Sequence, residues 1–270
     1  MSPSLVERVR LSAERTIAEQ LTREMPEARA AHLAQDVETQ RRYLLSYSLR
    51  LVPSMAPEAY EAAAEAARAL GCDDDVELYH ARERMEGRTA RLVLHGAPIG
   101  IELIGDCLDV CDRTELVAVI GHEIGHCLAH EGNPELAWVR AASLRSSPKT
   151  KRIYALASEL TADRLGLLAC RDLDAVLRLE MRGQMGRAPE RLRLDTRAYL
   201  EECKSLGEDL VARGRTMFGE THPEHYVRGY AEWLFTETDV YRSITGTGPG
   251  SRRLEDVDAV LATLLGLRRR

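Results

Sequence analysis

Apolar side chains recur at helical spacing in the first part of the chain. Leu5, Val9, Ile17 and Leu21 are separated by four or eight residues, with Glu and Arg between them. These intervals return to one face of an α-helix. We therefore expect an N-terminal helical segment over residues 1–70. Its role is open between an ordinary packing layer and a cover that limits access to a functional site.

Prolines divide this segment into shorter helices. Pro26 is expected to open a second helix that reaches about Leu51, and Pro57 begins an alanine-rich helix. Proline suits the first position of a helix, because the N–H group that it lacks would have no partner there. Gly71 can end the alanine-rich helix, since glycine readily adopts the left-handed conformation found at helix C-termini.

A strand pattern replaces the helical pattern after residue 71. Residues 76–79, 90–94 and 99–104 are short runs with many Val, Leu and Ile residues, and Gly-Ala-Pro at residues 96–98 forms a turn signal. Runs of this length and composition indicate β-strands. We expect a small sheet, and we expect its third strand to be a free edge that binds an extended peptide through Ile99, Ile101 and Leu103.

One helix is predicted over residues 113–130. Asp112 can cap it, and Glu115 occupies the third position of a capping box. Residues 116–120, Leu-Val-Ala-Val-Ile, form an apolar stretch that indicates burial. The polar residues that follow this stretch are therefore expected inside the protein.

The rest of the chain alternates helical patterns with polar breaks. Residues 143–151 are polar and basic, which predicts a loop, and residues 244–251 hold three glycines and a proline, which predicts a flexible connector. The pattern as a whole predicts an α+β fold that is mainly helical. The expected helices cover residues 153–170, a stretch from 173 onward, 195–213, 225–235 and 254–266.

Composition narrows the classes of function. The 270 residues carry a net charge of -6, and a nucleic-acid-binding protein would need a basic face. No run approaches the roughly 20 apolar residues that cross a bilayer, and the N-terminus lacks the apolar core of a signal peptide. The six cysteines form no C-x-x-C pair. We expect a cytoplasmic protein with free thiols and no membrane span.

The motif with the clearest chemistry is His122-Glu123-Ile124-Gly125-His126. Residues four apart lie on one face of a helix, so two imidazoles at this spacing can bind one tetrahedral zinc ion. Glu123 flanks the site and can accept a proton from a water molecule that the zinc activates. Two histidines satisfied by carbonyl groups or solvent would be the alternative interpretation.

A catalytic zinc site needs a third protein ligand and one open position. Glu159 is the best candidate. Asp163 lies one helical turn further on and can hydrogen-bond a ligating imidazole. Without the H-E-x-x-H motif, the same Glu/Asp pair beside Arg164 would indicate a surface ion-pair face. We therefore expect one Zn²⁺ per chain, bound by His122, His126 and Glu159.

Thr221-His222-Pro223 forms a third element, and Arg228 follows six residues after His222. A histidine fixed before a proline can direct a hydrogen bond at developing negative charge. Arg228 can pair with an acidic residue such as Asp163. A plain helix N-terminus without chemistry is the alternative interpretation.

The order of H-E-x-x-H, E-x-x-A-D and T-H-P with a downstream arginine resembles HtpX and CAAX-prenyl-protease type metallopeptidases, which are gluzincins. The resemblance covers about residues 76–235 and implies a zincin-like domain, here over residues 71–270. It implies that Glu123 is the general base and that His222 stabilises the oxyanion. The membrane-bound members of that family have transmembrane helices, which this sequence lacks.

These inferences predict a zinc-dependent endopeptidase that acts on a peptide or protein substrate. Two alternatives stay open. The first is a regulatory protease that cuts one cytoplasmic partner, as ImmA-like H-E-x-x-H proteins do. The second is a catalytically inert scaffold with a structural zinc, against which the intact Glu123 argues. The pattern leaves the oligomeric state undetermined.

Overall fold

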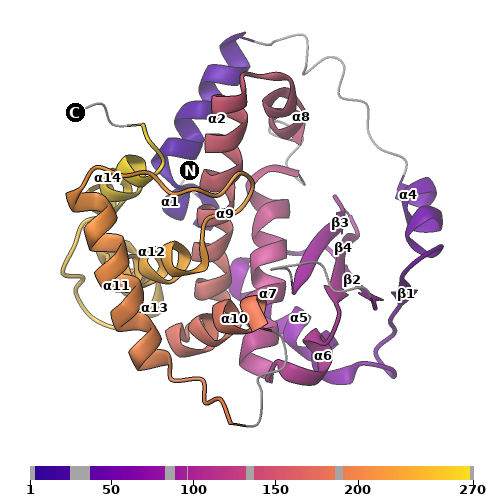
Figure 1. Ribbon diagram of the computed structural model, residues 1–270. Coiled ribbons are helices and arrows are strands. Elements are labelled where there is room, and N and C mark those ends of the chain that lie inside the picture. The colour runs from indigo at the N-terminus through magenta and orange to yellow at the C-terminus, as the bar shows by residue number, and fades with distance from the viewer. Residues whose placement is uncertain are drawn as a thin grey trace.

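A computed structural model describes residues 4–24, 37–82, 89–95, 97–131, 137–185 and 191–267. Two helices, α7 (Arg113–His126) and α9 (Pro148–Cys170), pack against each other in the centre. Figure 1 shows a small sheet on one side of this pair and the C-terminal helices on the other. The described chain is therefore α+β and mainly helical, as the sequence pattern predicts.

Helix α7 begins where its capping box predicts. The Asp112 side chain accepts a hydrogen bond from the Glu115 N–H, and the Glu115 side chain accepts one from the Asp112 N–H. Glu115 is fully buried and forms ion pairs with Arg178 and Arg182 of α10 (Leu173–Met185). A π-helical turn, Cys127–Glu131, extends α7 beyond its second motif histidine.

The predicted loop over residues 143–151 is wrong. Helix α8 (Ala137–Arg145) covers its start, and α9 begins at Pro148. The Ser147 side chain accepts a hydrogen bond from the Thr150 N–H, and Pro148 occupies the first turn of the helix. Polar residues at these positions form a helix cap rather than a loop.

Small residues let α7 and α9 approach closely. A Cβ atom added at Gly121 would lie 2.6 Å from the Cβ atom of Ala169. A Cβ atom added at Gly166 would lie 2.8 Å from the carbonyl oxygen of Ala118. Because both distances are shorter than real Cβ contacts, the helices can hold this separation only with glycine there. The close approach brings the side chains of the two helices within bonding reach of a shared atom.

The sheet has the order β1-β2-β4-β3 within the described residues. Strands β2 (Val76–Ala81) and β4 (Ile99–Ile104) are parallel, whereas β1 (Leu49–Arg50) pairs antiparallel with β2 and β3 (Ala90–Leu94) pairs antiparallel with β4. The three predicted strands are present. The fourth, β1, was not expected, because its two residues fall within the helix that was predicted to reach about Leu51.

The predicted edge strand is wrong. Strand β4, with Ile99, Ile101 and Leu103, has β2 on one side and β3 on the other, and all six of its residues are buried. A nearly continuous apolar run is typical of a central strand covered on both faces. The edge beside β4 is β3, whose three middle residues are only partly buried, as fits a strand that is covered less completely.

The N-terminal helices are part of the same cores as the rest of the chain. The first core joins the sheet, α5 (Pro57–Leu70), α7 and α9, and it includes Val6 and Val9 of α1 (Leu5–Val9). The second joins α2 (Ser12–Glu24) to α9 and the C-terminal helices. Both cores therefore contain residues from each side of the division predicted at residue 70. Helix α5 starts at Pro57 and ends before Gly71, as expected.

Most of the other predicted helices are present within a few residues of their expected bounds. The helix expected from Pro26 to Leu51 is only partly described: residues 25–36 lie outside the described ranges, and α4 (Val37–Leu44) ends well before Leu51. A short α13 (Asp239–Thr245) was not predicted and precedes the glycine-rich connector. The remaining helices are α6 (Cys107–Val110), α11 (Thr196–Ala212), α12 (His225–Thr236) and α14 (Leu254–Leu264).

Two further predictions from composition can be compared with the structure. All six cysteines are free thiols, as expected. In the described ranges, every helix falls short of the length or the apolar character that crossing a bilayer requires.

Candidate metal centre

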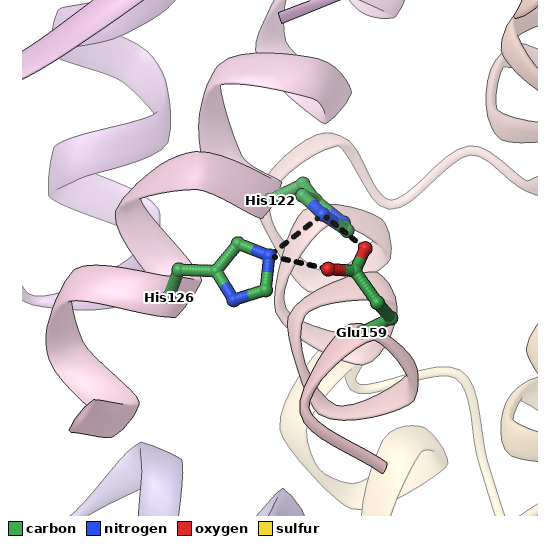
Figure 2. A group of neighbouring side chains, drawn as sticks. All are labelled: His122, His126 and Glu159. Carbon is green, nitrogen blue, oxygen red and sulfur yellow. Dashed lines mark hydrogen bonds and ion pairs between the residues drawn. The ribbon is translucent and has the colours of Figure 1, made fainter. Parts of the chain in front are cut away.

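Three predicted ligands meet between α7 and α9. Figure 2 shows His122 and His126 on α7, with Glu159 of α9 facing both rings. The Nε2 atoms of the two imidazoles are 3.1 Å apart. The Nε2 atom of His122 lies 3.4 Å from Oε2 of Glu159, and the Nε2 atom of His126 lies 3.4 Å from Oε1.

These distances fit one tetrahedral metal ion. Zinc bonds to nitrogen and oxygen of about 2.0–2.1 Å, at tetrahedral angles, place the ligand atoms roughly 3.3 Å from one another. The two Nε2 atoms lie 3.1 Å apart, and each lies 3.4 Å from one oxygen of Glu159, Oε2 for His122 and Oε1 for His126, so each of these separations is close to that value. Two imidazoles and one carboxylate are also the donor types that zinc prefers. The side chains of His122, His126 and Glu159 therefore lie close enough together to hold one metal ion.

A second layer of contacts fixes the orientation of His122. Its Nδ1 atom lies 2.9 Å from Oδ1 of Asp163. The Nε atom of Arg228 lies 3.0 Å from the other carboxylate oxygen of Asp163. A carboxylate at Nδ1 selects the tautomer in which Nε2 is free to bind a metal. The structure thus brings Asp163 and Arg228 together as the sequence predicts.

Burial and neighbouring charges determine whether the carboxyl groups of Glu159 and Asp163 are ionised. Burial alone would raise the pKa of Glu159, but the neighbouring imidazoles of His126 and His122 lower it well below its usual range. Burial also opposes ionisation of Asp163, yet Arg228 and the hydrogen bond to His122 bring its pKa to about 2. Both carboxylates are therefore ionised near neutral pH, as metal binding and imidazole orientation require.

The three ligands open onto a cavity of about 430 Å³. Glu123 also lines this cavity and is 6% exposed. His222 reaches the same cavity from the loop before α12, with its Nε2 atom 3.7 Å from Oε1 of Glu159 and its Nδ1 atom 2.9 Å from the hydroxyl of Thr221. All five residues predicted to bind zinc or to act on substrate therefore surround one space.

Strand β3 borders this cavity, whereas the residues predicted to bind substrate on β4 do not line it. Thr89, Ala90, Arg91 and Leu92 are lining residues. The Ile104 N–H donates to the Thr89 carbonyl at 2.9 Å, so hydrogen-bonded pairs with β4 alternate from residue 89 onward. The backbone groups of Ala90 and Leu92 consequently point away from β4, and no other described strand pairs with this side of β3, beside the predicted metal ligands.

The opposite wall holds charged residues that sequence reasoning missed. Glu180 of α10 lies 2.7 Å from Nδ1 of His225 and 3.1 Å from Nη1 of Arg228. Glu232 is 2% exposed and lines the cavity beside them. The spacing of His225, Arg228 and Glu232 along α12 is i, i+3 and i+7, a helical face that could have been read from the sequence. Glu180 comes from another helix and carries no such signal.

Comparison of the chain with family models, with curated proteins and with solved structures finds no match. A function for this chain is therefore inferred from the chemistry of the site itself.

Proposed function

We propose that the protein is a zinc-dependent endopeptidase with its active site between α7 and α9. The observation that carries this proposal is the meeting of two imidazoles and a carboxylate that line a cavity, with the Nε2 atoms 3.1 Å apart and each 3.4 Å from one oxygen of Glu159. A purely structural zinc site is usually closed by four protein ligands. Here three donors meet at the surface of a space that is large enough for part of a peptide.

Glu123 is proposed as the general base. It directly follows His122 on α7, and neighbouring residues of a helix do not share a face. Its side chain therefore lies beside the proposed ligands, and it lines the cavity. A bound zinc ion would polarise the scissile carbonyl and lower the pKa of a water molecule to about 7. Glu123 takes the proton from the attacking water and then returns it to the leaving amine.

His222 is proposed as the residue that stabilises the oxyanion. With three ligands present, His222 is not needed for metal binding, and its Nε2 atom lies 3.7 Å from a ligand oxygen of Glu159. The Thr221 hydroxyl contacts the other ring nitrogen. The imidazole can donate a hydrogen bond to the negative charge that forms on the carbonyl oxygen of the substrate.

Strand β3 takes the role that the sequence had assigned to β4. The outward N–H and C=O groups of Ala90 and Leu92 can pair with an extended substrate, in the manner of a strand added to a sheet edge. The same residues line the cavity, so the added strand would pass beside the metal centre. Main-chain hydrogen bonds would hold the peptide while its side chains contact the residues that line the cavity.

The experiment that tests the proposed activity is unbiased cleavage profiling. Zinc-loaded wild-type protein and Glu123→Gln are each incubated with a peptide library derived from a proteome, and new termini are identified by mass spectrometry. Wild type should produce new termini that Glu123→Gln does not. If the two profiles are identical, the chain is better described as the inert zinc scaffold. If one library peptide dominates the cleavage, a site-specific regulatory protease is favoured instead.

A further inference from the structure

One end of the cavity is an acidic recess, formed by Asp163, Glu180 and Glu232 around Arg228. These carboxyl groups come from α9, α10 and α12, and their residues are 3%, 4% and 2% exposed. All four residues line the same cavity as the metal ligands. The recess therefore adjoins the metal centre, to which Asp163 is joined through His122.

The charges in the acidic recess do not balance. Arg228 pairs with Asp163 and with Glu180, and the second oxygen of Glu180 contacts His225. Within the described part of the chain, Oε2 of Glu232 has no hydrogen-bond partner. Burial, reinforced by the carboxylates of Asp163 and Glu180, raises the pKa of Glu232 well above its usual range. A buried polar atom without a partner is costly, and such an atom on a cavity wall points to a ligand group that completes it.

The walls that lead to Glu232 are apolar. Val176 and Leu179 of α10 and Leu167 of α9 line the cavity. Lysine and arginine side chains have this same division, with an aliphatic stem that packs on apolar surface and a cationic head that needs polar partners.

Other residues that line the cavity carry charge of the other sign. They are Arg91 of β3, Arg140 of α8 and Lys151 in the first turns of α9, which belong to other elements than those that form the acidic recess, apart from α9. A basic side chain of a substrate would be attracted to the acidic recess rather than to these three cationic residues.

We propose that the acidic recess binds a lysine or arginine side chain adjacent to the scissile bond, with Glu232 as the residue that recognises the positive charge. This inference rests on the proposed peptidase function. An apolar side chain would fill the walls but leave the Glu232 oxygen without a partner. An acidic side chain would be repelled by Asp163 and Glu180, whose two negative charges exceed the single positive charge of Arg228.

The test uses zinc-loaded protein and a set of four peptides. The peptides differ only in the residue next to the scissile bond, which is Lys, Arg, norleucine or Glu. We expect kcat/KM for Lys and Arg to exceed the value for norleucine by about tenfold or more, the scale of a charge-assisted hydrogen bond. The Glu peptide should be the poorest substrate. In Glu232→Gln, the ratio of Lys to norleucine should fall toward one.

Glu202→Gln is the matched control, because it removes the same charge from an exposed position on α11. It should retain the wild-type preference. A second measurement needs no variant: butylguanidine should inhibit cleavage by the wild-type protein, whereas butanol at the same concentration should not.

Two failures can be distinguished. Cleavage with an apolar preference, or a Lys preference that survives in Glu232→Gln, would overturn the acidic recess as the specificity site and leave the peptidase proposal intact. Absence of cleavage of every peptide would count against the peptidase proposal. The recess is then tested by titration calorimetry with butylguanidine, where binding to wild type that is lost in Glu232→Gln supports a cation site and absence of binding refutes it.

Discussion

The Oδ1 atom of Asp163 lies 2.9 Å from the Nδ1 atom of His122, whereas the other ring nitrogen of His122, Nε2, faces Glu159. Asp163→Asn should lower zinc affinity by about 10–100-fold, because an amide no longer fixes the ring and tautomer as a carboxylate does. Competition against a zinc-binding dye measures this change. Asp209→Asn, which removes a carboxylate from an exposed ion pair on α11, should leave the affinity unchanged. If the two variants have the same zinc affinity, Asp163 does not contribute to metal binding.

His222→Phe should lower kcat by about 10²–10³-fold, the usual effect of losing one oxyanion donor. Its zinc content should stay at the wild-type level, and KM should change little, because the hydrogen bond forms mainly in the transition state. Steady-state kinetics with metal analysis of the same samples checks both statements. Loss of zinc in this variant would indicate that His222 is a ligand. An unchanged kcat would show that His222 takes no part in catalysis.

Leu92→Pro should raise KM for extended peptides, because it deletes an N–H group that points away from β4 toward the proposed substrate strand. Leu92→Ala is the matched control, since it also shortens the side chain but keeps the N–H group. Circular dichroism and zinc content should be equal in the two variants. If both variants bind substrate equally well, β3 does not pair with the peptide backbone.

Gly121→Ala should reduce the free energy of unfolding by about 1–3 kcal/mol, because the new methyl group would overlap that of Ala169. Zinc affinity should fall as well, since Glu159 would move away from the histidines. Ala169→Gly in the same chain removes the overlap and should recover part of both losses, although glycine itself costs about 1 kcal/mol in a helix. Urea unfolding of the single and double variants measures the coupling. Strictly additive effects would show that the two positions do not limit the approach of α7 to α9.

The grouping of His122, His126 and Glu159 could be predicted from the sequence because its signals are local. The i, i+4 spacing of His122 and His126 fixes their common face on any helix, and the Asp112 and Glu115 cap identifies where that helix begins. Glu159 and Asp163 likewise share one face of α9. Their pairing with α7 depends on the close approach at Gly121 and Gly166, which no local pattern reveals.

The substrate edge and the acidic recess could not be predicted in the same way. Strand order depends on pairing between distant segments, so the apolar run from Ile99 to Ile104 identifies a strand without saying which strands flank it. Glu180 approaches Arg228 only through the packing of α10 against α12. The spacing of polar residues along α12 could have indicated a polar face on that helix. It could not have indicated that Glu180 of α10 contacts this face.

The most direct test of the catalytic zinc centre measures zinc content and peptide hydrolysis together in Glu123→Gln and Glu159→Gln. Glu123→Gln should keep about one zinc per chain and lose nearly all hydrolysis, because it removes the proton acceptor but none of the ligands. Glu159→Gln should lose most of the zinc and the hydrolysis together. Substantial turnover in Glu123→Gln, or full zinc occupancy in Glu159→Gln, would contradict the mechanism.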